Sequence, residues 1–402
     1  MDILERFLGY VSINTNSDEE NENCPSSPNQ LLLAKKLVEE MKCIGITDAR
    51  ADEHGYVYGS IPANAENQPA IGLIAHMDTS SAVPGGPVVP RVFRYEGGDI
   101  ALNSEKGIVM PEKDYETLKR DRGAELVVTD GTTLLGADDK AGIAVIMDVA
   151  EKLMKDGSIP HGKVCIGFTP DEEIGRGADL FDVEHFGADF AYTLDGGALE
   201  EMEYENFNAA SARITVRGFS IHPGSAKDKM INALKVAMEF DRMLPECEVP
   251  ENTEGYEGFH HLDSLCGEVA QARADYIIRD HDREKFEEKK RGFERIAAYL
   301  NEKYGSGTVT LEIRDSYYNM RGIIEQDMSI IHRAEEALRG AGYAPVAVPI
   351  RGGTDGARLS YMGLKCPNIG AGGRNFHGIF EYLNVDEMRK ASCVVTEIVR
   401  AR

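Results

Sequence analysis

The chain lacks the features that would place it in a membrane or outside the cell. None of its apolar runs approaches the roughly 20 residues that a membrane helix needs. The best candidate, 141–150, is interrupted by Asp148. Residues 1–10 interleave charged and apolar side chains, without a basic stretch ahead of an apolar core. We therefore predict neither a membrane span nor a secretory signal.

Paired cysteines and excess positive charge are also missing. The 7 cysteines show no CxxC spacing and their number is odd, so we expect reduced thiols in a cytoplasmic protein. Lys and Arg number 44 against 68 Asp and Glu, which leaves a formal charge of −24. This charge disfavours phosphate backbones and anionic membrane surfaces, so no nucleic acid and no membrane is predicted as a partner. It would also suit a protein that binds cations, although many enzymes are acidic for solubility alone.

The 402 residues predict more than one domain. Between residues 30 and 200, helical apolar stripes alternate with short apolar runs at 71–75, 163–169 and 190–194. Such runs are typical of strands buried on both faces. The alternation predicts an α/β fold with a mixed, largely parallel sheet between helices.

The pattern changes near residue 207 and returns after Gly322. The elements expected in between are a strand at 209–216, a helix at 231–243, a strand at 268–278, a helix at 283–303 and a strand at 308–313. This order could bury one sheet face under two helices. We therefore predict a discontinuous domain, 1–206 and 320–402, interrupted by a small α+β domain at 207–319.

An imidazole and a carboxylate follow the strand expected at 71–75. His76 and Asp78 are two residues apart, so their side chains point the same way on an extended segment. A metal ligand and the residue that orients it fit this arrangement. An ordinary His–Asp hydrogen bond in a loop is the alternative.

Two pairs of adjacent acids stand beside expected helices and strands. Asp138 and Asp139 precede a helix, and Glu172 and Glu173 follow the strand at 163–169. Adjacent carboxylates repel each other unless cations or helix-terminal amides compensate. In a turn, one carboxylate can face a metal while its neighbour faces an attacking water. The alternatives are an acidic first turn of a helix and a solvated acidic turn.

Two further candidates complete an ordered set. Asp195 ends another strand and His377 lies late in the chain, and either alone would be an ordinary loop residue. Open α/β sheets hold their ligands at strand ends. The order His, Asp, Glu, Asp, His therefore predicts ligands for two divalent, zinc-like ions. Three carboxylates and one hydroxide would neutralise two such ions.

These motifs, in this order, resemble the M20 family of dinuclear zinc peptidases. They are His76-x-Asp78, Asp138-x-Lys140, Glu172-Glu173, Asp195 and His377. Other segments carry the same resemblance along almost the whole chain: Glu53-His-Gly-Tyr-Val-Tyr, Asp130-Gly-Thr-Thr-Leu-Leu-Gly-Ala-Asp-Asp-Lys-Ala-Gly and Tyr276-Ile-Ile-Arg-Asp.

The resemblance implies a role for each metal candidate. Asp138 would bridge two zinc ions, with His76 and Asp195 on one ion and Glu173 and His377 on the other. Spacing alone leaves Asp138 and Asp139 open as the bridge, and the family pattern selects Asp138.

By the same resemblance, Asp78 would orient His76 and Glu172 would be the general base. Glu172 would take a proton from a metal-bridging water and deliver it to the leaving amine. The implied activity is a metallo-aminopeptidase that releases the N-terminal residue of tripeptides.

The inserted domain resembles the lid and dimerisation domain of that family, which implies a homodimer. His222 would reach the partner's active site and help bind the carbonyl oxygen. Arg279 is a candidate for the C-terminal carboxylate of a short peptide, because a guanidinium fork matches a carboxylate. A surface histidine and an exposed arginine are the alternatives. The turn at 351–356 could offer free amides to the substrate, or be only a flexible turn.

Two other functions stay open. A deacylase of N-acyl amino acids on the same scaffold would keep the metals and the base. A non-enzymatic binding protein on this fold would not need Glu172 together with all five expected ligands. The segments near Glu53 and Asp130 favour the peptidase.

Overall fold

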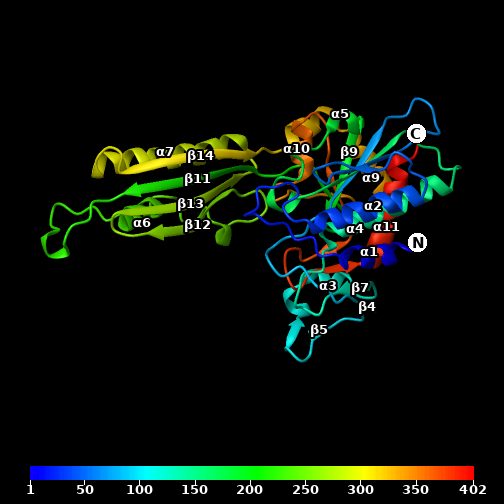
Figure 1. The fold of residues 1–402 in the computed structure, drawn as a ribbon, viewed down its shortest axis with the longest axis horizontal. Coiled ribbons are helices and arrows are strands. Elements are labelled where there is room, and N and C mark those ends of the chain that lie inside the picture. The colour runs from blue at the N-terminus through cyan, green and yellow to red at the C-terminus, as the bar shows by residue number, and fades with distance from the viewer. The chain divides into compact units, whose positions relative to one another are not determined.

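The computed structural model describes residues 1–402 and divides into two compact units. Figure 1 labels many of their helices and strands. The first unit comprises Met1–Tyr204, Gly322–Val348 and Thr354–Arg402. The second comprises Glu205–Arg321 together with Pro349–Gly353. The second unit is therefore an insertion that also takes in a short segment from later in the chain.

An eight-stranded sheet organises the first unit, in the order β1-β2-β8-β3-β9-β16-β10-β15. Its strands are β1 Arg50–Ala51, β2 Val57–Ile61, β3 Ile71–His76, β8 Val164–Thr169, β9 Phe190–Gly196, β10 Glu201–Glu203, β15 Val346–Ala347 and β16 Asn368–Gly370. Strands β8, β3, β9 and β16 run parallel, and antiparallel pairs flank them. Every residue of β3 and β8 is buried. The expected mixed α/β sheet is confirmed.

Helices cover this sheet. The helices of the first unit include α1 Ile3–Val11, α2 Asn29–Cys43, α3 Glu116–Arg120, α4 Ala137–Lys155, α5 Val183–Phe186, α9 Ser329–Gly340, α10 Asp355–Tyr361 and α11 Val385–Val399, of which α3 packs instead with the small sheets described below. Helix α4 contacts β3 and β9 and is covered by α1 and α11. Helices α5 and α10 contact β8 and β9. None of the helices is both long enough and apolar enough to span a bilayer.

Two small sheets of the first unit were not expected from the sequence. One has the order β17-β18-β7-β4 and the other pairs β5 with β6. Their strands are β4 Arg91–Arg94, β5 Ile100–Asn103, β6 Ile108–Met110, β7 Glu125–Val128, β17 Gly373–Arg374 and β18 Tyr382–Asn384. Strands this short carry too few residues to show an alternation of polar and apolar side chains.

A four-stranded antiparallel sheet forms the second unit, in the order β12-β13-β11-β14. Its elements are β11 Asn208–Arg217, α6 Ala233–Arg242, β12 Phe259–Gly267, β13 Gln271–Asp280, α7 Arg283–Tyr304 and β14 Val309–Tyr317. Alternate residues of β11 and β13 are buried, as one covered sheet face requires. Phe240 of α6 and Phe293 of α7 pack into that core. The expected α+β insertion is confirmed.

One element of the second unit was missed. The expected strand at 268–278 corresponds to β13, and β12 precedes it as its hairpin partner. The pairing is irregular between Leu262 and Ser264, and His261, Leu262 and Leu265 are only half-buried. A bulge shifts the side-chain alternation by one residue, so no periodic signal marks this strand.

Candidate metal centre

The candidate ligands come from the ends of neighbouring parallel strands. His76 is the last residue of β3, and Asp195 lies near the end of β9. Glu172 and Glu173 lie in the 3₁₀ turn Glu172–Ile174 that follows β8. Because β8, β3 and β9 are parallel, their carboxyl ends meet at one edge of the sheet, where such folds bind ligands.

Asp138 lies between two imidazoles from distant parts of the chain. Its Oδ1 is 2.8 Å from His76 Nε2, and its Oδ2 is 3.1 Å from His377 Nε2. Burial would raise the pKa of Asp138, but the hydrogen bonds from His377 and His76 outweigh it and hold that pKa below its ordinary value. A carboxylate whose two oxygens face two different histidines is positioned to bridge two metal ions, one beside each histidine.

Asp139 has different partners. Its Oδ1 accepts the backbone N–H of Gly142 at 3.1 Å, and its Oδ2 accepts that of His76 at 3.3 Å. Asp138 and Asp139 have non-helical dihedral angles although α4 is assigned from Ala137. The two carboxylates therefore diverge. Asp139 binds backbone amides with both oxygens, and Asp138 is directed toward both histidines.

Glu173 joins this cluster through His377. Its Oε2 is 2.9 Å from His377 Nε2, and its Oε1 is buried without a hydrogen-bond partner. Burial, and next the charge of Asp138, raise the pKa of Glu173 to about 7. A buried carboxylate oxygen without a partner is costly, and a cation at this position would satisfy it.

Asp195 lies near the ring nitrogen of His76 that also contacts Asp138. Its Oδ1 is 3.5 Å from His76 Nε2. Two overlapping triads have ligand atoms within 4.8 Å of one another: His76 with Asp138 and Glu173, and His76 with Asp139 and Asp195. The second triad contains Asp139, and we favour Asp138 for the bridge because both oxygens of Asp139 accept amides.

The donor set fits divalent cations. Buried carboxyl groups outnumber the positive groups around them, and burial is the largest cause of the raised pKa values of Glu172, Glu173 and Asp195. Imidazole and carboxylate donors together suit zinc-like ions. Two such ions would compensate charge that this chain leaves unbalanced.

Asp78 orients its neighbours differently from what its spacing suggested. His76 Nδ1 lies 3.0 Å from the Asp78 backbone carbonyl and 3.5 Å from its carboxylate Oδ1. The carboxylate accepts the backbone N–H groups of Glu172 at 2.9 Å and Glu173 at 3.1 Å. The carbonyl thus sets the orientation of the imidazole, while the carboxylate holds the turn that carries both glutamates.

The side chain of Glu172 has a different hydrogen-bond partner from that of Glu173. Its Oε1 accepts the backbone N–H of Asp355 at 3.2 Å, at the first turn of α10. Burial, and next the charge of Asp195, raise the pKa of Glu172 well above its ordinary value. A carboxylate with a raised pKa beside a metal-type cluster is suited to accept and return a proton.

Glu381 binds the loop that leads into α4, and Lys140 joins α4 to the segment after α1, although neither residue was predicted to have a role. Glu381 accepts the N–H groups of Leu135, Gly136 and Asp138 at 2.7, 2.8 and 3.1 Å. Gly136 has a φ of 81°, which glycine adopts without strain. Lys140 Nζ donates to the Ile13 carbonyl at 2.8 Å. In the sequence, the only signal for Glu381 was an acid four residues after His377.

The two substrate candidates lie in the second unit. His222 is exposed, and its Nδ1 accepts the N–H of Gly224 at 3.2 Å. Arg279 donates to the carbonyls of Ala210 and Ile278 at 3.2 and 3.0 Å, and its guanidinium lies over the Tyr317 ring. Both residues are therefore partly engaged within their own unit.

Arg351, which begins the expected substrate turn, also belongs to the second unit. It donates to the carbonyls of Gly255 and Glu257 at 2.9 and 3.0 Å and lies over the rings of Phe207 and Phe259. Thr354 and Asp355 belong to the first unit. The turn is thus anchored at its start rather than free.

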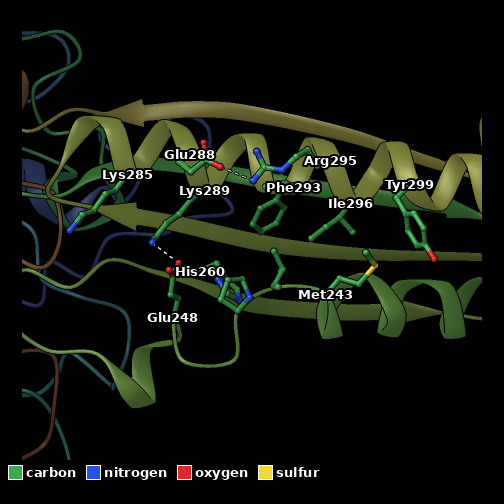
Figure 2. Close-up of a pocket in the computed structure, with 13 residues that line it drawn as sticks. Met243, Glu248, His260, Lys285, Glu288, Lys289, Phe293, Arg295, Ile296 and Tyr299 are labelled. Carbon is green, nitrogen blue, oxygen red and sulfur yellow. Dashed lines mark hydrogen bonds and ion pairs between the residues drawn. The ribbon is translucent and has the colours of Figure 1, made fainter.

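A pocket of about 750 Å³ lies in the second unit, and none of the candidate ligands is among the residues that line it. Figure 2 shows Phe293 and Ile296 of α7 facing it, together with Met243 after α6. Lys289 pairs with Glu248 at 2.5 Å and Arg295 with Glu288 at 2.7 Å beside it. No residue expected to do chemistry lines it, so the strand-end cluster is the candidate active site.

Comparison with known proteins decides the family. Residues 204–308 match the peptidase dimerisation domain of M20 enzymes. Peptidase T of Geobacillus kaustophilus is 53% identical over 99% of this chain and 98% of its own length. Peptidase T of Clostridium acetobutylicum is 52% identical over the same shares.

The chain belongs to the peptidase T family.

Membership makes the chain a peptidase, which confirms the hydrolase class and the resemblance expected from the sequence.

Solved structures of related peptidases share the fold of this chain. A crystal structure of aminopeptidase PepT from Bacillus cereus superposes with a TM-score of 0.78 at 22% identity, covering 99% of this chain and 97% of that one. A dinuclear metal binding peptidase of the M20 family from Bacillus subtilis has a TM-score of 0.66 at 15% identity, covering 99% and 96%. At these identities the likeness concerns the fold.

Proposed function

We propose that this chain is a metallo-aminopeptidase that releases the N-terminal residue of tripeptides. The observation that carries the proposal is the position of Asp138, whose two oxygens face His76 and His377, with Glu172 half-buried in the turn after the neighbouring strand β8. The peptidase T relatives support the substrate class.

Two divalent ions, zinc by preference, are the proposed cofactors. His76 and Asp195 would hold one ion, Glu173 and His377 the other, and Asp138 would bridge them. Imidazole and carboxylate donors favour zinc among the abundant ions. When bound, a pair of such ions lowers the pKa of water and polarises the scissile carbonyl.

Glu172 is the proposed general base, and it acts through its own geometry. The N–H of Asp355 fixes one of its oxygens, and the Asp78 carboxylate fixes its backbone. Glu172 takes a proton from the attacking water and returns it to the nitrogen of the departing peptide. Such positioned proton transfer contributes roughly 10²–10⁴-fold to the rate.

The second unit is proposed to act as the lid of a homodimer. Its match to a peptidase dimerisation domain supports this assembly. His222 is the candidate for binding the carbonyl oxygen of a peptide in the partner's site. Arg279 is the candidate for the C-terminal carboxylate, because a charge-assisted fork binds carboxylates strongly.

The alternative is a deacylase of N-acyl amino acids that uses the same ligands and base. The two activities differ at the amino end of the substrate, since an aminopeptidase needs a free amine and a deacylase needs an acylated one. The strand-end cluster suits either reaction, and the peptidase T relatives favour the peptidase.

A single series of substrates tests the proposal. Metal-free protein is reconstituted with zinc, and kcat/KM is measured for a tripeptide, its N-acetyl form and its C-terminal amide, with a dipeptide and an N-acetyl amino acid beside them. We expect the free tripeptide to be cleaved fastest, the amide more slowly and the acetylated form hardly at all. Equal or faster cleavage of the acetylated compounds would establish the deacylase instead.

A further inference from the structure

Glu203 is a carboxylate near the candidate metal centre that the proposed reaction does not use. It is the last residue of β10 and is half-buried. Its carboxylate accepts one hydrogen bond, from Asn368 Nδ2 at 3.4 Å, and no lysine or arginine pairs with it. Carboxylates in such surroundings are costly unless a positive group compensates them.

A chain of contacts links Glu203 to the proposed base. Asn368, which donates to Glu203, also contacts the hydroxyl groups of Thr193 at 2.5 Å and Thr354 at 3.1 Å. Thr354 is the N-cap of α10, and the next N–H in the chain, that of Asp355, donates to Glu172. The side chain of Glu203 is thus held by the same framework that orients Glu172.

The sheet places Glu203 close to the metal candidates. Glu203 pairs with Asn368 on β16, and Asn368 pairs with Thr193 on β9, two residues before Asp195. Strands are spaced by about 4.8 Å, so β10 lies only about 10 Å from β9. Burial, and next the charge of Asp195, raise the pKa of Glu203 to about 8. Carboxylates therefore lie one after another from the candidate metal centre to Glu203, which has no lysine or arginine of its own.

We propose that Glu203, oriented by Asn368, binds the free α-ammonium group of the peptide substrate. The inference rests on the proposed aminopeptidase function and gives it a residue that recognises the amino end. The α-amine is attached to the carbon beside the scissile carbonyl, so its binding group must lie near the metal centre and the base. An ammonium would supply the positive partner that Glu203 lacks. Substrates with an acylated amine carry no ammonium group, so Glu203 would select against them.

The test compares two ligands that differ only in this amine. Alanyl-glycyl-glycine carries it, and propionyl-glycyl-glycine does not. Wild-type protein and Glu203→Gln, both loaded with zinc, are assayed for kcat/KM on each compound, and the propionyl compound is measured as a competitive inhibitor where its turnover is too slow. Hydrogen bonds to charged groups contribute about 1.5–3 kcal/mol, so Glu203→Gln should lose roughly 10- to 100-fold on the alanyl compound.

The expected result is selective. The propionyl compound should bind or react equally well with both proteins, because the group that Glu203 binds is absent from it. The effects of removing the substrate amine and of replacing Glu203 are then not additive, as expected when the two groups interact directly. Equal losses on both compounds, or no loss on the alanyl compound, would overturn the inference.

Glu201→Gln is the matched control. Glu201 lies on the same strand and its carboxylate accepts the N–H of Ala198 at 3.0 Å. It should keep the wild-type preference for the amine, and a selective loss like that of Glu203→Gln would show a general charge effect and overturn the inference. Metal content and thermal midpoint are measured for each variant. If Glu203→Gln fails to fold, Glu203→Asp replaces it, with a smaller selective loss expected and an unchanged preference contradicting the inference.

The outcomes separate this inference from the proposed function. Wild-type protein that cleaves the alanyl tripeptide, with a variant whose preference is unchanged, refutes the role of Glu203 alone. Wild-type protein that cleaves only acylated compounds refutes the aminopeptidase function, and the inference falls with it.

Discussion

At the scale of single residues, adjacent acids in this chain have different partners. Asp138 faces two imidazoles, whereas Asp139 accepts two backbone amides. Glu173 contacts His377, whereas Glu172 accepts the N–H of Asp355. Neighbouring side chains diverge in turns, so two chemically equal residues can serve a metal site and a proton transfer side by side.

This divergence predicts opposite outcomes for the two glutamates. Glu172→Ala should retain both metal ions and lose turnover by roughly 10²–10⁴-fold, because only the proton transfer is removed. Glu173→Ala should lose metal as well, because a proposed ligand is removed. Metal analysis of the purified variants, together with kcat on a tripeptide, checks both statements. A folded but metal-free Glu172→Ala protein would reverse the assignment.

At the scale of elements, one buried arginine joins three helices of the first unit. Arg6 of α1 donates to Glu40 of α2 and to Glu151 of α4, and its side chain is 1% exposed. Hydrogen bonds from Lys155 and from Arg6 lower the pKa of Glu151 to about 2. This carboxylate therefore stabilises the fold in its ionised form, away from the candidate metal centre.

The sign of this shift predicts how stability depends on pH. Because the folded pKa of Glu151 lies below its unfolded value, its contribution is complete above the unfolded value of 4.5 and is lost as the pH falls toward 2. Glu151→Gln should lower the free energy of unfolding at pH 7 by between about 1 and 3 kcal/mol. The difference from wild type should therefore narrow as the pH falls from 4.5 toward 2, the interval between the unfolded and the folded pKa.

Urea unfolding at several pH values measures this difference. Glu397→Gln is the matched control, because Glu397 pairs with Arg400 across one turn of α11 and is 51% exposed. Exposed pairs contribute less than about 1 kcal/mol, so this variant should resemble wild type. A loss for Glu151→Gln that is constant from pH 7 to pH 3 would show that its packing matters and its charge does not.

At the scale of the whole molecule, the metal candidates and the lid candidate lie in different units. His76, Asp138 and His377 belong to the first unit, and His222 belongs to the second. The second unit carries the match to a peptidase dimerisation domain. If the lid acts across a dimer, His222 of each subunit completes the active site of the other subunit.

Subunit mixing tests this arrangement. His222→Ala and Glu172→Ala should each be nearly inactive alone, and heterodimers should recover part of the tripeptidase activity, because one of their two sites combines an intact His222 with an intact Glu172. The heterodimer is isolated by two affinity tags before the assay. Each variant mixed with itself is the control. Heterodimers that show no recovery would mean that His222 acts within its own subunit or has no role.

The sequence predicted the elements with a strong periodic signal and missed those without one. The buried strands β3, β8 and β9 appear as continuous apolar runs, so their positions and the α/β class followed directly. Strand β12 carries a bulge and polar side chains, and β17 has only two residues. Their pairing depends on partners far along the chain, which no local pattern records.

The sequence by itself determined which chemical groups stand at the ends of the buried strands, because spacing along a strand sets the side on which a residue lies. Only the tertiary structure decided how those groups divide their roles. The carboxylate of Asp78 holds the backbone of Glu172 and Glu173, and Glu381 holds the loop that carries Asp138. The direction of a side chain in a turn follows from the backbone, and here distant residues fix the backbone through hydrogen bonds that sequence spacing does not encode.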